Sequence, residues 1–206
     1  MDQFEGFFDK DYTGVDVGDG KGVDLVGQGQ LLEFPSGHLD TAISCECLEH
    51  NTFWSETVAN MMRMTRPGGL VVLTCASTGR KEHGTTRSIL EFSPLTNKIG
   101  WDYYRNVSAF DLARAINLSR WLDRYIHVTN WNSNDLYLIG IRTGGECDDA
   151  GDLRALECKI EVFVRTNGIK NNFQRAVGIV IGDAGFMAIA AGRRSLGRIK
   201  RKLLAK

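Results

Sequence analysis

The sequence lacks an excess of charge of either sign, because its 25 Lys and Arg residues are matched by 25 Asp and Glu residues. A chain without net charge has no overall attraction to nucleic acid, to an anionic membrane or to an acidic partner. The composition therefore predicts no specific nucleic-acid partner. The substrate has to be inferred from a local site.

Paired cysteines are also lacking. The five cysteines are an odd number, and Cys45 and Cys47 are separated by Glu46 alone, which is neither a zinc-binding nor a redox spacing. Most of them lie in apolar, strand-like segments, where cysteine commonly serves packing. The pattern predicts a reduced, cytoplasmic chain and no metal site.

The sequence shows no signal for export and no membrane span. The first residues contain no basic stretch followed by an apolar run. The longest weakly polar stretch, Phe173–Gly192, contains Arg175 and Asp183, which a spanning helix would have to bury in lipid. These observations agree with the expected cytoplasmic localisation.

Apolar runs alternate between strand and helix patterns in the first half of the chain. Short strands are predicted at residues 12–17, 23–26, 40–45 and 70–75, and a helix at 53–66, with Trp54, Val58, Met61 and Met62 on one face. Pro67-Gly68-Gly69 is expected to end that helix and turn the chain into the next strand. The alternation predicts an α/β fold with a parallel sheet.

The second half of the domain begins with a long segment, residues 77–107, that lacks periodicity and is predicted to be a functional loop with at most a short helix. Ser108 and Asp111 have the spacing of a capping box, which predicts a helix toward Leu118. Residues 125–129 and 136–142 then form a predicted terminal hairpin, which places one antiparallel strand at the edge of the sheet.

A change of composition follows the hairpin. Residues 1–142 are predicted to form one domain, 143–152 a linker, and 153–206 a C-terminal appendage. The tail at 193–206 carries seven basic residues and no acidic one. A frayed, solvated terminus is the favoured interpretation of the tail, and weak contact with a membrane surface is the alternative.

Four segments in a fixed order carry a family resemblance: residues 12–17, Phe34-Pro35, residues 40–50 and residues 66–73. Together they resemble the later strands of a class I S-adenosylmethionine-dependent methyltransferase, over roughly residues 8–142. The resemblance implies a Rossmann-like sheet, S-adenosyl-L-methionine as cofactor, and methyl transfer to a small-molecule or glycan-like acceptor, most simply at oxygen.

The resemblance also implies a set of cofactor-binding residues. Asp16 ends a strand and would accept hydrogen bonds from the ribose hydroxyls, although an Asp that caps a turn is the plainer alternative. Val17 would pack on the adenine. Gln28 and Gly29 stand where the family usually has an acidic and a small residue, and Gln28 can still accept from an amine. Beyond the next strand, the Glu46 carboxylate suits the charged methionine half of the cofactor, beside Cys45.

Two histidines are candidate catalytic bases. A base is needed only if the accepting group is a hydroxyl, and because the histidine side chain ordinarily titrates near neutral pH, His50 and His83 are the candidates to take its proton. The resemblance and the chemistry of the side chains indicate five candidate substrate-binding residues: Glu49, Arg87, Tyr103, Tyr104 and Arg105.

The glycine-rich cofactor loop of the family, with the first strand before it, has no counterpart ahead of residue 12. Three interpretations stay open: a truncated gene product, a natural minimal protein with weakened cofactor binding, or a gap filled by another segment, for which residues 159–164 and the turn after them are a candidate. The alternative function is a catalytically silent, methyltransferase-like interaction module.

Overall fold

The computed structural model describes residues 12–145, 155, 158 and 159. The basic tail, most of the predicted linker and most of the strand predicted at 159–164 lie outside these residues, while Lys159, which was expected to begin that strand, is helical. In the described part no helix is long and apolar enough to cross a membrane.

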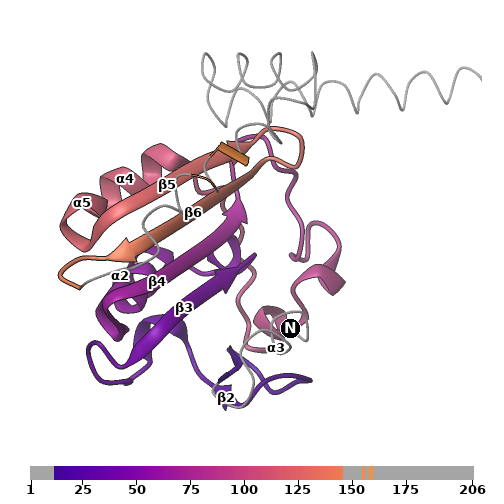
Figure 1. Cartoon of the computed structure of the whole chain (residues 1–206). Helices are drawn as coiled ribbons and strands as arrows, with labels where there is room; N and C mark the ends of the chain where they lie inside the picture. Colours follow the sequence, from indigo (N-terminus) through magenta and orange to yellow (C-terminus); the bar gives the residue numbers. More distant parts are fainter. Residues whose placement is uncertain (1–11, 146–154, 156–157, 160–206) are drawn as a thin grey trace, which may run out of the picture.

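The centre of the fold is a four-stranded mixed sheet in the order β3-β4-β6-β5. Its strands are β3 (Leu39–Cys45), β4 (Thr65–Ala76), β5 (Leu122–Asn130) and β6 (Asp135–Arg142). β3 and β4 are parallel, while β6 runs antiparallel to both β4 and β5. The predicted α/β class and terminal hairpin are therefore confirmed, as Figure 1 shows.

The position of the antiparallel strand differs from the prediction. β6 lies inside the sheet, between β4 and β5, and β5 occupies the edge of the described part. After β4 the chain forms the edge strand β5. It then turns back through the hairpin and forms β6, which pairs with both β5 and β4. Leu136 and Leu138 of β6 are completely buried, in agreement with a strand that is paired on both sides.

A second sheet contains the two shortest strands, β1 (Val15–Asp16) and β2 (Leu25–Val26), which are parallel to each other. The strand predicted over residues 12–17 is thus limited to two residues. Contrary to the expected single parallel sheet, β1 is not hydrogen-bonded to β3 or β4 in the described part of the chain.

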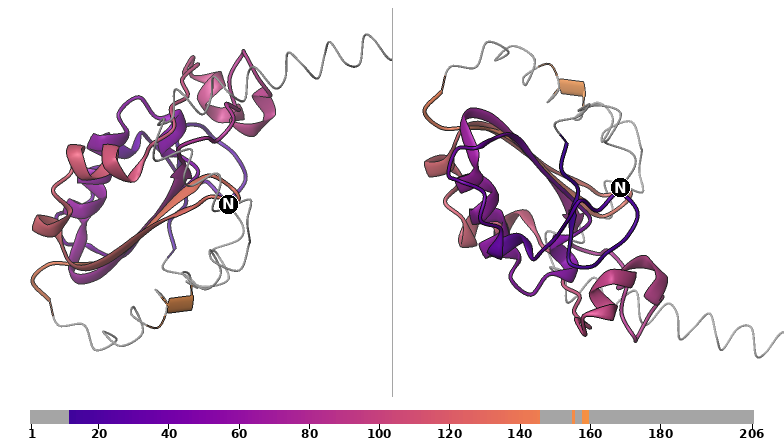
Figure 2. Two further views of the ribbon diagram at one scale, coloured as in Figure 1. Left: turned by 90° about the horizontal axis from the view of Figure 1, so that it is seen from above. Right: turned by 90° about the horizontal axis from the view of Figure 1, so that it is seen from below.

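Three helices cover one face of the four-stranded sheet: α2 (Trp54–Met64), α4 (Ala109–Ala115) and α5 (Leu118–Trp121). Seen along the sheet in Figure 2, α2 and α4 lie on the same side of it. The core forms beneath them, where alternate residues Val71, Leu73 and Cys75 of β4 are completely buried. This alternation is the usual signature of a strand with one face in the core.

The ends of the helices follow the local sequence. α2 has the predicted buried face and ends at Met64, where the Thr65 hydroxyl donates to the Met61 carbonyl at 2.8 Å. Ser108 and Asp111 form the predicted capping box at the start of α4. α2 therefore begins and ends within two residues of its expected bounds, whereas α4 ends at Ala115, three residues before the expected Leu118.

Pro67-Gly68-Gly69 does not form the expected turn between helix and strand, because β4 already begins at Thr65. Pairing with β3 is irregular here: Leu39 is opposite Thr65, and the next partners are Thr41 and Leu70. Gly68 has a positive φ of 75°, so the three residues form a bulge within the strand.

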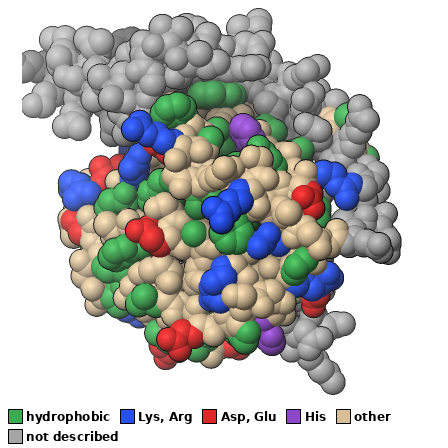
Figure 3. All heavy atoms as spheres, turned by 90° about the vertical axis from the view of Figure 1, so that its left-hand side faces the viewer, with side chains coloured by type: hydrophobic (Ala, Val, Ile, Leu, Met, Phe, Trp, Pro, Cys, Tyr) green, Lys and Arg blue, Asp and Glu red, His purple; other side chains and the backbone are tan. Residues whose placement is uncertain are grey.

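The segment at 77–107 contains η4 (Leu90–Phe92) and α3 (Pro94–Lys98), which confirms the expectation of a largely irregular loop with a short helix. Two other single turns, η2 (Gly29–Leu31) and η3 (Leu48–His50), follow β2 and β3. On the face shown in Figure 3, basic and acidic side chains are interspersed, in line with the neutral composition.

Candidate functional site

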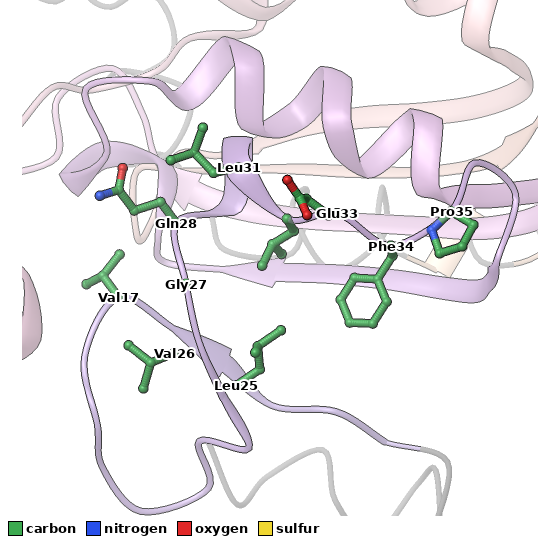
Figure 4. Close-up of a pocket in the computed structure, with 10 residues that line it drawn as sticks. Val17, Leu25, Val26, Gly27, Gln28, Leu31, Glu33, Phe34 and Pro35 are labelled. Atoms are coloured by element: carbon green, nitrogen blue, oxygen red, sulfur yellow. The ribbon is translucent and has the colours of Figure 1, made fainter.

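An open cleft of about 670 Å³ lies beside the β1–β2 pair. Figure 4 shows Val17, Leu25 and Val26 on one side of it and Leu31 and Phe34 on the other. The complete lining is Val17, Leu25, Val26, Gly27, Gln28, Leu31, Leu32, Glu33, Phe34 and Pro35. The cleft is thus largely apolar, as expected of a surface that receives a planar ring.

Asp16 lies at the end of β1, directly beside this cleft. Parallel pairing with β2 places Asp16 opposite Val26, and the Gly27 amide donates to the Asp16 carbonyl at 2.8 Å. The Asp16 carboxylate accepts the Val17 amide at 2.7 Å. Half-burial raises the pKa of Asp16, which these backbone hydrogen bonds partly oppose. A carboxylate has lone pairs for further donors, so the local hydrogen bond leaves room for ribose hydroxyls.

Gln28 and Gly29 follow β2 and join the cleft to α2. The amide oxygen of Gln28, which was expected to accept from adenine, accepts the Gln30 side-chain amide at 2.8 Å. The Gly29 carbonyl accepts from the Asn60 side chain at 2.9 Å. A Cβ at position 29 would lie 2.6 Å from the Thr57 methyl group, so only glycine fits against α2 here.

Cys45 and Glu46 lie at the carboxyl end of β3, separate from the lining of the cleft. Glu46 has a positive φ of 51°, an uncommon conformation for a residue other than glycine. Its carboxylate accepts from the Thr74 hydroxyl at 3.1 Å, and its amide donates to the Thr74 carbonyl at 2.9 Å. Both Cys45 and Glu46 are exposed.

Three predicted site residues come together just beyond β3. Glu49 and His50, on the η3 turn, meet His83 from the long loop, and one ligand-type atom from each lies within 4.8 Å of the other two. The His83 Nε2 atom lies 3.9 Å from a Glu49 carboxylate oxygen. Among the residues that the structure describes, this is the one such set of three or more His, Cys, Asp or Glu side chains.

The group formed by Glu49, His50 and His83 is largely shielded from solvent. Glu49 is 0% and His50 3% exposed. Neither Glu49 carboxylate oxygen nor His50 Nδ1 has a partner that satisfies hydrogen-bond geometry. Buried polar atoms are paired in the great majority of folded proteins, so three unpaired atoms in one place call for an explanation.

Burial perturbs the protonation of this group. It raises the pKa of Glu49 to about 8, and the nearby negative charge of Glu46 adds to the rise. Burial also lowers the pKa of His50 to about 4, and His83 acts in the same direction. Desolvation penalises the charged form in both cases, so both side chains are predominantly neutral at pH 7.

Tyr104 holds the two imidazoles in place. Its ring centroid lies 5.6 Å from that of His50 and 5.0 Å from that of His83, both in edge-on contacts. The Tyr104 hydroxyl donates to the Asn106 side chain at 2.8 Å. Tyr104 is therefore close to the candidate bases, as a substrate-binding residue would be, and it also anchors the loop to the core.

The other predicted substrate-binding residues are more distributed. Arg87 forms ion pairs with Glu82 at 2.8 Å and Asp102 at 3.2 Å. Arg105 donates to the Asp111 carboxylate at 2.6 Å, and its guanidinium lies 5.8 Å from the Trp54 ring centroid. Both guanidinium groups thus have structural partners.

Tyr103 is half-buried and lies next to the group through its backbone, whose hydrogen bond to the His50 ring opposes the fall of the His50 pKa. Gly84 also contacts His50 and was not predicted. It has a φ of 69°, and a Cβ there would lie 2.6 Å from the His50 Cε1 atom. A glycine in a loop of mixed composition gives no sequence signal for such a contact.

The comparison with known proteins found a family-model match in the first part of the chain. Residues 9–73, about a third of the sequence, match the family model of a methyltransferase domain. This segment forms β1, β2, η2, β3, η3, α2 and most of β4, so it contains both the cleft and the η3 turn. The match covers less than half of the chain, so it shows that this segment is similar to a methyltransferase domain.

Several solved structures share a distant likeness. The [4+2]-cyclase SpnF is 14% identical at a TM-score of 0.40, over 60% of this chain and 57% of its own. Burkholderia thailandensis 1,6-didemethyltoxoflavin-N1-methyltransferase is 15% identical at a TM-score of 0.42, over 64% of this chain and 61% of its own. The chain thus spans about three fifths of these proteins, and the likeness is too distant to indicate an activity or an acceptor. No curated protein matches the sequence.

Proposed function

We propose that the chain transfers a methyl group from S-adenosylmethionine to a hydroxyl of a small-molecule or glycan-like acceptor. The observation that carries the proposal is the match of residues 9–73 to a methyltransferase domain, since this segment builds the cleft beside Asp16. In the proposed complex the adenosine lies in that cleft. Asp16 accepts from the ribose, and Val17 packs on the adenine.

The residues fit this cofactor in part. The apolar side chains of Val17, Leu25 and Leu31 suit an adenine ring, and the Asp16 carboxylate has lone pairs to spare. The Gln28 amide oxygen must exchange its bond with Gln30 for one with the adenine amine. Glu46 and Cys45, at the carboxyl end of β3, are the proposed contacts of the methionine half.

The reaction itself is a displacement at the methyl carbon. The acceptor oxygen forms a bond to that carbon while the bond between carbon and sulfur breaks, and the sulfonium becomes a neutral thioether. The hydroxyl proton passes to a base, for which His50 and His83 are the candidates. Because His83 comes from the partly exposed loop while His50 is buried, His83 is the better placed to meet an incoming acceptor.

Calorimetric titration of the full chain with S-adenosylmethionine tests the cofactor site. We expect binding that Asp16→Ala weakens about tenfold to a hundredfold, through lost hydrogen bonds to a charged acceptor. Asp19→Ala is the matched control, because Asp19 is an exposed aspartate in the neighbouring turn. The absence of heat at millimolar cofactor would contradict the enzyme proposal and favour the silent interaction module.

A further inference from the structure

The Glu49, His50 and His83 side chains have a composition that methyl transfer alone does not require. Two imidazoles and one carboxylate converge, with one ligand-type atom from each within 4.8 Å of the other two. Two histidines and one carboxylate are a recurrent donor set for divalent zinc and iron, with one or more coordination positions left open. A base for a hydroxyl would need one of these side chains, not three.

The spacing of the atoms fits a bound ion after a small contraction. Two ligands of a tetrahedral zinc ion, each about 2.0–2.2 Å from the metal, lie roughly 3.4 Å apart. The Nε2 atom of His83 and the nearer Glu49 oxygen are 3.9 Å apart. A shift of about half an ångström, within the normal range of side-chain motion, therefore brings both atoms to coordination distance.

The outer nitrogen of His83 is held as it is in metal-binding histidines. Its Nδ1 atom lies 3.0 Å from the Lys81 carbonyl oxygen. A carbonyl can only accept, so Nδ1 carries the hydrogen and the Nε2 lone pair faces Glu49. A ring nitrogen that donates to a backbone carbonyl fixes the tautomer and orients the opposite lone pair, which is the common arrangement around bound metals.

The partners of His50 complete the arrangement. Its Nδ1 atom is unpaired and buried, while Gly84 and Tyr104 pack against the ring. Both Glu49 oxygens are also unpaired, and the side chain is 0% exposed. Burial makes the charged form of this carboxyl group costly, and a bound cation would stabilise it.

We propose that Glu49, His50 and His83 bind a divalent transition-metal ion, with zinc as the closest match to the donor set. Imidazole nitrogen favours such ions over magnesium or calcium, which prefer oxygen ligands. Three protein ligands leave a coordination position for water or for an acceptor oxygen. The site stands on its own geometry and does not depend on methyl transfer.

A metal ion and a transferred proton would use the same lone pairs of the histidines, so an experiment can distinguish a metal site from a catalytic base. A histidine that accepts a proton works without metal and is insensitive to a chelator. A histidine that binds the ion cannot accept a proton, and the oxygen on the metal is instead the group that loses one. Metal binding measured without cofactor or acceptor therefore succeeds or fails independently of the proposed methyl transfer.

The test uses the full chain, stripped of metal with a chelator and titrated with Zn²⁺ by calorimetry and with Co²⁺ by visible absorption. We expect one ion per chain and no heat with Mg²⁺ at the same concentration. The Glu49→Gln, His50→Gln and His83→Gln variants should each bind at least tenfold more weakly. His38→Gln and His127→Gln are matched controls and should bind as the parent does, since neither residue belongs to the group.

Two further variants keep the result decisive. Thiols are zinc ligands in their own right and Cys45 and Cys47 are exposed, so a Cys45→Ser, Cys47→Ser double variant must retain the ion. His83→Gln changes a partly exposed loop residue, and its circular dichroism should match that of the parent. The proposal is overturned if no ion binds, if the three group variants bind as the parent does, or if the double cysteine variant loses the ion.

Discussion

The cleft beside β1 and β2 and the group formed by Glu49, His50 and His83 are built differently. Leu31 and Val26 in the cleft are 65% and 55% exposed, and the strands below them are two residues long. Glu49 and His50 are buried and follow a seven-residue strand of the main sheet. The cleft is therefore a largely exposed surface, whereas the group is already enclosed by protein.

The largest expected difference is in the free energy of unfolding, to which core side chains should contribute far more than side chains of the cleft. Leu73→Ala in β4 removes a completely buried side chain beside α2 and should lower the free energy of unfolding by about 2–5 kcal/mol. Leu31→Ala in the cleft removes an exposed side chain and should change it by less than about 0.5 kcal/mol. Urea denaturation of both variants measures the difference. Equal losses would show that the cleft contributes to the core.

Substitution of the candidate bases should lower turnover without changing cofactor affinity at the cleft. Once an accepting hydroxyl compound has been identified, His83→Ala should lower kcat by on the order of a hundredfold, while cofactor affinity stays unchanged. His50→Ala should have a similar effect if the two imidazoles act together. His127→Ala, at an exposed position of β5, is the control. A parallel loss of cofactor affinity would instead indicate a structural role.

The shifted pKa values of Glu49 and His50 predict that the stability of the protein depends on pH. Glu49 has a pKa raised to about 8, so in metal-free protein the folded state holds a proton that the unfolded state has lost, and stability falls as the pH rises toward 8. His50 acts oppositely, since its pKa is lowered to about 4 and stability falls as the pH drops below 6.5. The two effects offset each other in mildly acidic solution.

Between pH 6.5 and 8 only the Glu49 effect remains. Denaturation in the presence of a chelator should therefore show stability declining across this window, on the order of 1–2 kcal/mol. Glu49→Gln has no titrating carboxyl and should remove the decline. A slope that persists in the variant would assign the effect to another group.

A pair of glycines provides the smallest and most local comparison. Gly84 and Gly100 both have positive φ, and a Cβ at Gly84 meets His50 and Ser93 at 2.6 Å, whereas a Cβ at Gly100 meets nothing within 4 Å. Each Gly→Ala change should cost about 1 kcal/mol of backbone strain. Only Gly84→Ala should also lower turnover or metal affinity. Identical behaviour of the two variants would separate Gly84 from the group.

The sequence predicted the regular elements well because burial imposes a period on them. The helical spacing of Trp54, Val58 and Met62 and the capping box at Ser108 were sufficient to locate α2 and α4. The turn predicted at Pro67-Gly68-Gly69 was wrong because proline and glycine are common in bulges as well as in turns. Only pairing with β3 decides between the two. The inner position of β6 depends in the same way on pairing between distant strands.

The sequence named Glu49, His50 and His83 but not their association. His83 comes from an irregular loop, and no periodicity relates it to the η3 turn. The absence of a recognisable ligand spacing led to the expectation of no metal site, because spacing rules apply to ligands that lie close in sequence. Contacts through Gly84 and the Lys81 carbonyl depend on backbone conformation, which composition does not encode.

The loop that supplies His83 leaves the sheet and returns to it at almost the same point. The Val107 amide donates to the Ala76 carbonyl at 2.9 Å, at the end of β4. With its two ends fastened together, the intervening segment behaves as an insertion, and doubling the length of such a loop costs only about 0.6 kcal/mol in closure entropy. The segment can therefore be exchanged or lengthened without redesigning the sheet beneath.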